Sequence, residues 1–363
     1  MKRTVFGVLS GALAACAVAV LPIGCRKDLC YNHYREARIA IGWECVWERD
    51  YGRGWSSAWP EEEFGMTYEA LNPSALPSGI SMLDYDAAGH ATQNFLSPDG
   101  GSVALSEGVH SFLLYNNDTE YIVFNDMASF PSASATTTSR TRATFVNPHA
   151  GERTVNAPDV LYGAFLENVP PVELHQSIVL SATLRPLVYA YLVRYEFDKG
   201  AEYIALARGA LSGMAESVYL RDGRTSSRTA TVLYDCTPAS WGAQAVVHSF
   251  GVPDFPDKYY KPLADGETPE RSYTLNLEIR LRNGKTKTFD RDVTAQLRNQ
   301  PRGGVIVVDG LTISDEEVGS DSGFDVSVDD WGEYEDITLP LNPSKGFSGA
   351  TTDNKQPLNI KKT

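Results

Sequence analysis

The side chains that could carry out chemistry are few and scattered along the 363-residue chain. The chain has six histidines, which stand far apart: His33, His90, His110, His149, His175 and His248. No Gly-x-Ser-x-Gly elbow, Gly-x-Gly-x-x-Gly loop, P-loop or His-Glu-x-x-His motif occurs. We therefore expect a protein that is not an enzyme and needs no cofactor.

Two acidic runs could attract calcium. They are Glu61-Glu62-Glu63 and Asp315-Glu316-Glu317. An EF-hand loop places its oxygen ligands at alternate positions around a glycine, and neither run has that spacing. We interpret both runs as solvated loops and expect no metal.

Four tryptophans in the first part of the chain could bind a ligand, because flat aromatic faces stack on sugar rings. Trp43 and Trp47 fall on the apolar face of a predicted strand, so we assign them to the core. Trp55 and Trp59 lie in a segment rich in glycine and serine. These two are the candidate ligand-binding residues, and a glycan is the candidate ligand.

The N-terminus has the form of a secretory signal peptide. Lys2 and Arg3 precede an uncharged apolar run that ends at Gly24. The following residue, Cys25, is typical of a lipoprotein signal, in which this thiol is acylated and becomes the first mature residue. Cys16 is the alternative acylation site, but cleavage there would leave apolar residues exposed, so we favour Cys25. An uncleaved signal anchor is the other alternative, since about 20 apolar residues span a bilayer.

The charge balance excludes several kinds of partner. With 46 acidic and 32 basic residues the chain carries a net charge of -14. Removal of residues 1–24 would take away two positive charges and make the mature protein still more acidic. Unassisted binding to nucleic acid is therefore not expected. Cys30, Cys45 and Cys236 could form at most one disulfide, and their spacing matches neither a zinc ribbon nor a redox motif.

Apolar residues alternate with polar ones in many short segments, which is the pattern of β-strands. Asn283-Gly284 between two such segments predicts a hairpin with a type I′ turn. The predicted strands are 38–47, 79–84, 109–115, 121–124, 187–197, 217–220, 229–234, 273–281, 285–293, 305–308 and 336–341.

Strands without alternating helices indicate an all-β fold of two β-sandwich domains. We predict a signal peptide over 1–24, an N-terminal domain over 25–172, a C-terminal domain over 173–341 and a polar, disordered tail over 342–363.

Several segments resemble the fimbrillin-like lipoproteins of Bacteroidales, in particular a sub-family of unknown function. The resemblance begins at Cys25-Arg26-Lys27-Asp28-Leu29-Cys30 and continues through the segments 108–118, 184–189 and 210–215. It covers most of residues 25–313 and implies two tandem transthyretin-like (Greek-key) sandwiches. The motifs are structural and less specific than a catalytic signature.

The resemblance implies a lipid-anchored, palmitate-bearing protein of the outer membrane and cell surface. Its implied function is that of a fimbrial anchor or accessory subunit in cell adhesion, with fimbrial subunits or other surface proteins as partners. Stalk subunits of this kind are cleaved by an arginine-specific protease, whereas anchors keep the lipid. Arg53 is the nearest candidate cleavage point, but it follows the first predicted strand, so we interpret it as a loop residue. A cell-surface glycan-binding lipoprotein is the alternative function.

Partners in this class join by β-strand addition. The last predicted strand contains Ile337, Leu339 and Leu341. These residues either complete the second sandwich of their own molecule or are offered to a neighbour. An exposed apolar edge strand is an aggregation hazard, which favours self-completion.

Overall fold

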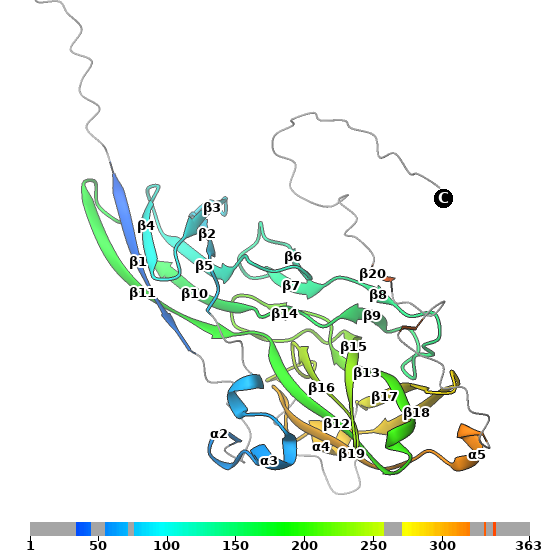
Figure 1. The fold of residues 1–363 in the computed structure, drawn as a ribbon. Helices are drawn as coiled ribbons and strands as arrows, with labels where there is room; N and C mark the ends of the chain where they lie inside the picture. Colours follow the sequence, from blue (N-terminus) through cyan, green and yellow to red (C-terminus); the bar gives the residue numbers. More distant parts are fainter. Residues whose placement is uncertain are drawn as a thin grey trace, which may run out of the picture.

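The computed structural model describes residues 34–44, 55–71, 76–257, 271–319, 330–331 and 337–338. These residues form an all-β protein whose helices are all short (Figure 1). The predicted all-β class is confirmed. The strands form two large sheets, each folded around its own apolar core.

The first sheet has seven strands in the order β3-β2-β5-β10-β11-β1-β4. They are β1 (Arg35–Trp43), β2 (Ile80–Tyr85), β3 (Ala91–Leu96), β4 (Gly100–Ala104), β5 (His110–Asn116), β10 (Tyr162–Val169) and β11 (Gln176–Pro186). Strands β11, β1 and β4 lie across a core from β3, β2, β5 and β10, so the sheet makes a sandwich. Apolar residues at alternate positions of these strands form the core. It includes Ile39, Met82 and Phe112, none of which is more than 1% exposed.

The second sheet runs β18-β17-β13-β15-β16-β12-β19, with β9 added beside β15. The strands are β9 (Arg153–Asn156), β12 (Tyr189–Lys199), β13 (Ile204–Ala215), β15 (Thr229–Ala239), β16 (Gly242–Ser249), β17 (Thr274–Leu281), β18 (Thr286–Asp292) and β19 (Gly304–Thr312). The hairpin predicted from Asn283-Gly284 joins β17 to β18. There Gly284 has a φ of 82° and Leu281 N donates to Lys285 O at 2.8 Å.

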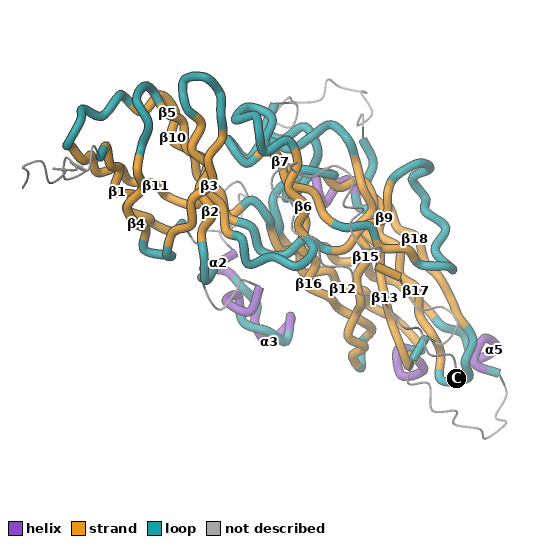
Figure 2. Tube along the Cα trace, turned by 90° about the horizontal axis from the view of Figure 1, so that it is seen from above, coloured by secondary structure: helices purple, strands orange, loops and turns teal. Residues whose placement is uncertain are grey.

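A third apolar core joins the two sandwiches. Leu113 and Tyr115 on the outer face of β5 pack with Leu187, Leu220 and Phe250 of the second sandwich. A small sheet of β6 (Ile122–Asn125), β7 (Ser134–Thr137) and β14 (Val218–Tyr219) covers this core, and β6 and β7 lie between the large sheets in Figure 2. Because the core draws on both sandwiches, they form one packed body.

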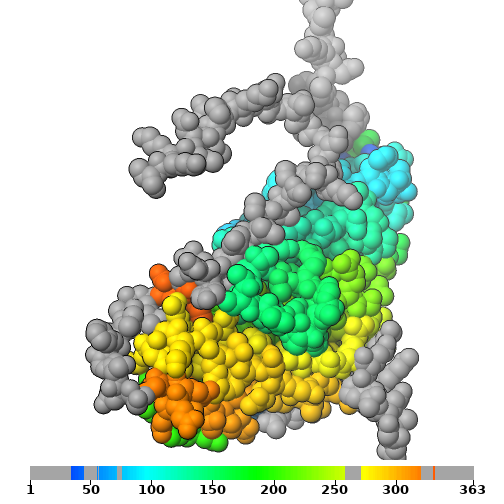
Figure 3. Space-filling model, turned by 90° about the vertical axis from the view of Figure 1, so that its right-hand side faces the viewer, coloured from blue at the N-terminus to red at the C-terminus, as the bar shows by residue number. Residues whose placement is uncertain are grey.

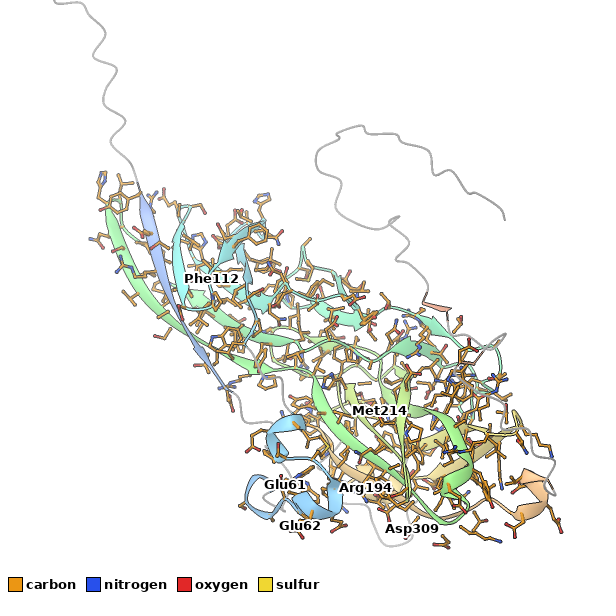
Figure 4. All side chains as sticks on the ribbon, viewed as in Figure 1. Glu61, Glu62, Phe112, Arg194, Met214 and Asp309 are labelled. Atoms are coloured by element: carbon orange, nitrogen blue, oxygen red, sulfur yellow. The ribbon has the colours of Figure 1, made fainter. Side chains whose placement is uncertain are left out.

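A second connection comes from the segment between β1 and β2. It forms α2 (Trp55–Ala58), α3 (Glu61–Phe64) and the 3-10 turn η1 (Tyr68–Leu71), which pack on Leu192 and Val305 of the second sandwich. Arg194 of β12 donates to the Glu63 carbonyl and lies 4.1 Å from the Trp241 ring. Figure 4 shows Arg194 beside helix α3, which carries both Glu61 and Glu62. In the same view Phe112 lies inside the first sandwich and Met214 inside the second.

The chain from Thr138 to Glu152, which includes β8 (Arg140–Thr141), covers the outer face of the second sheet with polar contacts. Figure 3 shows this green segment against the yellow strands. Beneath it Arg208 and Glu278 form a buried pair, with Nε and Oε2 2.9 Å apart, and Thr144 Oγ1 donates to Glu278 at 2.8 Å. Pairing and hydrogen bonding offset the desolvation of both charges.

The remaining helical turns are η2 (Ala201–Tyr203), α4 (Thr294–Leu297) and α5 (Asp315–Val318). The two acidic runs of the sequence thus begin short helices, α3 and α5, and in α5 Glu317 forms a capping box with Ser314. In this part of the chain the acids serve local structure and surface charge.

Candidate functional site

The outer edge of β11 is the clearest candidate for an interaction site. Over Gln176–Leu184 this strand pairs in parallel with β1. On its other side it meets β10 only through Tyr162↔Pro186 and Gly163↔Arg185. Within the described ranges, no strand pairs with that side of Gln176–Leu184. An unpaired edge presents a row of backbone N–H and C=O groups that can accept another strand.

The side chains of this edge differ from those of a protected one. Residues 176–184 contain no charge and no proline, the two features by which edge strands usually resist pairing. Val179 on the outer face is 69% exposed. Ile178 and Leu180 point toward the first core but are only partly buried, whereas Leu184 is fully buried. The apolar interior is therefore partly accessible at Ile178 and Leu180, in the first half of β11.

The place between β11 and β4 is filled by β1 of the same molecule. Nine residues of β1 pair with β11, and Glu36–Ala40 pair with β4. The first described strand therefore completes this half of the sandwich. Figure 1 shows β1 and β11 as a long pair at the left of the molecule. The unpaired edge lies on the other side of β11.

A cavity of about 310 Å³ lies where β10 and β11 converge. Three arginines line it, Arg185, Arg221 and Arg302, together with one acid, Asp222. Arg185 Nε lies 3.2 Å from Glu44, and Arg221 is bound by both oxygens of Glu167 at 3.1 and 2.9 Å. The arginines are therefore held in place at the end of the unpaired edge.

Two short described segments, 330–331 and 337–338, lie against the second sandwich. Ile337 and Thr338 form β20, which pairs antiparallel with β8. The Trp331 ring lies 3.8 Å from the guanidinium carbon of the buried Arg208. This pairing is internal to the molecule, in a two-stranded sheet outside both large sheets. Leu339 and Leu341, the other candidate exchange residues, lie outside the described residues.

The candidate ligand residues Trp55 and Trp59 pack on each other. Their rings are 5.8 Å apart in an edge-to-face arrangement, and Trp59 also contacts Phe64 at 4.8 Å. Trp55 is only 8% exposed, and Trp59 Nε1 donates to the Met66 carbonyl at 2.7 Å. This packing attaches α2 and α3 to the second sandwich and argues against Trp55 as a stacking platform.

The other titratable groups serve the fold. His110 and Asp84 form a buried pair with 2.7 Å between Nδ1 and Oδ1, and burial raises the pKa of Asp84. Cys236 is a free cysteine, and burial raises the pKa of its thiol, so it is a poor nucleophile. No group of three or more metal-binding side chains occurs in the ranges that the structure covers.

The predicted lipid attachment site is not part of the described structure. Cys25, Cys16, Cys30 and Cys45 are outside the described residues. Of the residues the structure describes, no helix is long and apolar enough to cross a membrane.

Comparison with known proteins gives a family model and several relatives. The model described as "Domain of unknown function (DUF5119)" matches residues 71–235, which run from the end of η1 into β15 and cover parts of both sandwiches. The protein named "Putative fimbrium anchoring subunit Fim4B" of Bacteroides ovatus is 26% identical over 151 residues, or 41% of this chain. That match spans 44% of the relative's length.

One solved structure agrees with the fold over most of its length. A crystal structure titled "putative adhesin", from Bacteroides ovatus, matches with a TM-score of 0.54 and 18% identity, and covers 80% of this chain and 97% of that one. These findings confirm the resemblance to the fimbrillin-like proteins. The fimbrial anchor protein Mfa2 of Porphyromonas gingivalis also matches, at a TM-score of 0.41 and 12% identity over 75% of this chain and 90% of that one.

The comparisons and the geometry support different conclusions about this chain. The comparisons show the all-β fold over most of the described residues, and the names of the relatives refer to fimbriae and adhesion. The strand edge and the arginine cavity come from the structure. Sequence reasoning missed both, although alternation in the uncharged segment 177–184 is a visible strand signal.

Proposed function

We propose that the protein is a non-enzymatic fimbrial subunit of the cell surface, acting as an anchor or accessory subunit, and that it joins its partner by β-strand addition. The observation that carries this proposal is the unpaired, uncharged edge of β11, which leads along partly buried apolar residues. Main-chain hydrogen bonds along such an edge supply affinity, and alternate side chains supply specificity. The relatives named as a fimbrium anchoring subunit and an adhesin support this class of function.

The anchoring mechanism follows from the order of the parts. Residues 1–24 act as a lipoprotein signal peptide, and acylated Cys25 holds the protein at the outer membrane. Two transthyretin-like sandwiches follow as domains, with the 173–341 part beginning just before β11. Strand pairing groups β11 with the first sandwich, so we place the last change of sandwich between Pro186 and Leu187.

The junction suits a part that transmits force. The third core includes Leu113, Leu187 and Phe250, none more than 5% exposed, and α2 and α3 add a second connection. Domains that share a large apolar interface move little relative to each other. The two sandwiches thus act as one rigid body that holds the proposed docking edge in place.

Co-purification of fimbrial subunits tests the proposal. Lysine at edge positions opposes strand pairing, so Val179→Lys with Ser181→Lys should reduce the fimbrillin-like protein recovered with the tagged chain by at least about tenfold. Val146→Lys is the matched control, because Val146 is 85% exposed and lies in the segment that covers the outer face of the second sheet. Equal recovery from all three forms would overturn strand addition at this edge.

A further inference from the structure

The arginine cavity lies at the end of the proposed docking edge. The same two strands form both features, since Gly163, Ala164 and Phe165 of β10 and Thr183, Arg185 and Pro186 of β11 line the cavity. A strand added along Gln176–Leu184 would therefore place its end beside these residues. The inference below rests on the proposed strand addition and concerns what the end of that strand carries.

The charge of the lining differs from that of the protein. The chain carries a net charge of -14, yet the charged residues that line the cavity are Arg185, Arg221, Arg302 and the single acid Asp222. Glu44 and Glu167 brace two of the arginines from outside the lining. A guanidinium has five N–H donors in a planar fork, so one bound carboxylate does not exhaust its capacity for another.

Apolar surfaces surround the charged groups. Leu187, Tyr189 and Leu220 are each at most 5% exposed and form part of the wall, while Phe165 is 41% exposed at the rim. Arg302 lies 4.5 Å from the Phe255 ring and 5.5 Å from the Tyr189 ring. Packing on these two rings limits the access of water to Arg302, which strengthens the attraction between its guanidinium and an anion. A volume of about 310 Å³ accommodates one side chain with its charged end.

We propose that this cavity binds the carboxylate of an aspartate or glutamate at the end of the partner's added strand. Strand addition brings a polypeptide to the edge, and the anions that a polypeptide carries are carboxylates. The uncharged edge accepts many apolar strands, whereas the cavity selects those that end in an acid. The cavity therefore sets both the register and the identity of the partner strand.

Short peptides test this inference on the purified mature chain. The parent peptide has eight residues of alternating threonine and valine, acetylated and amidated. Because the added strand could run in either direction, glutamate is placed at one end or the other, with glutamine at the same place as its control. Binding is measured by calorimetry or by NMR titration. A further peptide carries N-methyl groups on alternate residues, which remove its main-chain donors.

We expect one of the two glutamate peptides to bind about tenfold more tightly than its glutamine control. One charge-assisted hydrogen bond would give a difference of this size. Arg185→Gln and Arg302→Gln should abolish this difference. The matched control Arg298→Gln, an exposed arginine of the second sandwich outside the cavity lining, should keep it. Arg185 is 61% exposed, so its replacement leaves the fold intact.

The outcomes separate the two proposals. Equal binding of glutamate and glutamine peptides, or a difference that survives both cavity substitutions, would overturn the role of the cavity. If the N-methylated peptide binds as well as its parent, strand addition at β11 is refuted. The preference for glutamate over glutamine still tests whether the cavity binds a carboxylate. If no peptide binds, both proposals fail.

Discussion

The joint core between the sandwiches makes a sharp prediction at Leu113. This residue lies on β5, next to Leu114, and the two side chains point to opposite faces of the strand. Leu114 belongs to the core of the first sandwich, and Leu113 belongs to the core shared with the second. Both are 0% exposed. A strand buried on both faces is expected only if the second sandwich covers the first.

The size of the effect follows from this burial. Leu→Ala at a fully buried site costs about 2–5 kcal/mol, since the lost transfer free energy adds to the cost of the cavity. A substitution at an exposed site changes the free energy of unfolding by less than about 0.5 kcal/mol. We therefore expect Leu113→Ala to cost about as much as Leu114→Ala. If nothing packed on the outer face of β5, Leu113 would face water and its truncation would be almost neutral.

Denaturant unfolding of the mature chain measures both variants, with Val146→Ala as the matched control because Val146 is 85% exposed. The midpoint should fall for Leu113→Ala and Leu114→Ala and stay unchanged for Val146→Ala, with the m-value preserved. A near-neutral Leu113→Ala beside a costly Leu114→Ala would refute the shared core and the single rigid body.

Further outcomes are expected from the same structure. Cys25→Ala should release the protein from the membrane fraction, and mass spectrometry that finds lipid on Cys16 instead would move the mature start by nine residues. Leu277→Ala should cost about 2–5 kcal/mol in denaturant unfolding, because Leu277 is 0% exposed. Deletion of residues 336–363 should leave a folded chain by circular dichroism, since β20 is part of neither large sheet, and unfolding would contradict this. Burial lowers the pKa of His248 in the folded chain, so protonation favours the unfolded chain. The contribution of His248 to the free energy of unfolding should therefore be fully present above pH 6.5 and decrease as the pH falls below it. His248→Asn should flatten this decline in denaturation measured across pH.

Much of the fold could be predicted from the sequence because half-buried strands leave a period of two. The segments around Ile39, Leu113, Tyr191 and Leu277 all form strands. Others, such as β11, were missed because their alternation is mixed with serine, threonine and alanine. The predicted boundary at residue 172 assigns β11 to the second domain, whereas β11 pairs in the first sheet. No linker-like composition marks the point where the chain last passes from the first sandwich to the second.

The site could be predicted only in part, because it depends on contacts between distant segments. Trp55 looks exposed in a Gly/Ser-rich segment, but burial against Leu192 and Val305 is a tertiary effect. The arginine cavity unites residues from four segments, one in β10 and three that carry Arg185, Arg221 and Arg302. Local patterns also do not show that, within the described residues, Gln176–Leu184 of β11 is paired on one side alone. The lipid site at Cys25, in contrast, depends on a local motif and stays a prediction.

Photocrosslinking in the native cell tests the central claim most directly. A benzophenone amino acid in place of Val179, on the exposed side of β11, should form an adduct with a fimbrillin-like subunit, and peptide mapping should place the link in a β-strand segment of that subunit. The same amino acid in place of Val146 should not form this adduct. Failure to obtain a fimbrillin-like adduct from Val179, or an equal yield from Val146, would contradict strand addition at the β11 edge.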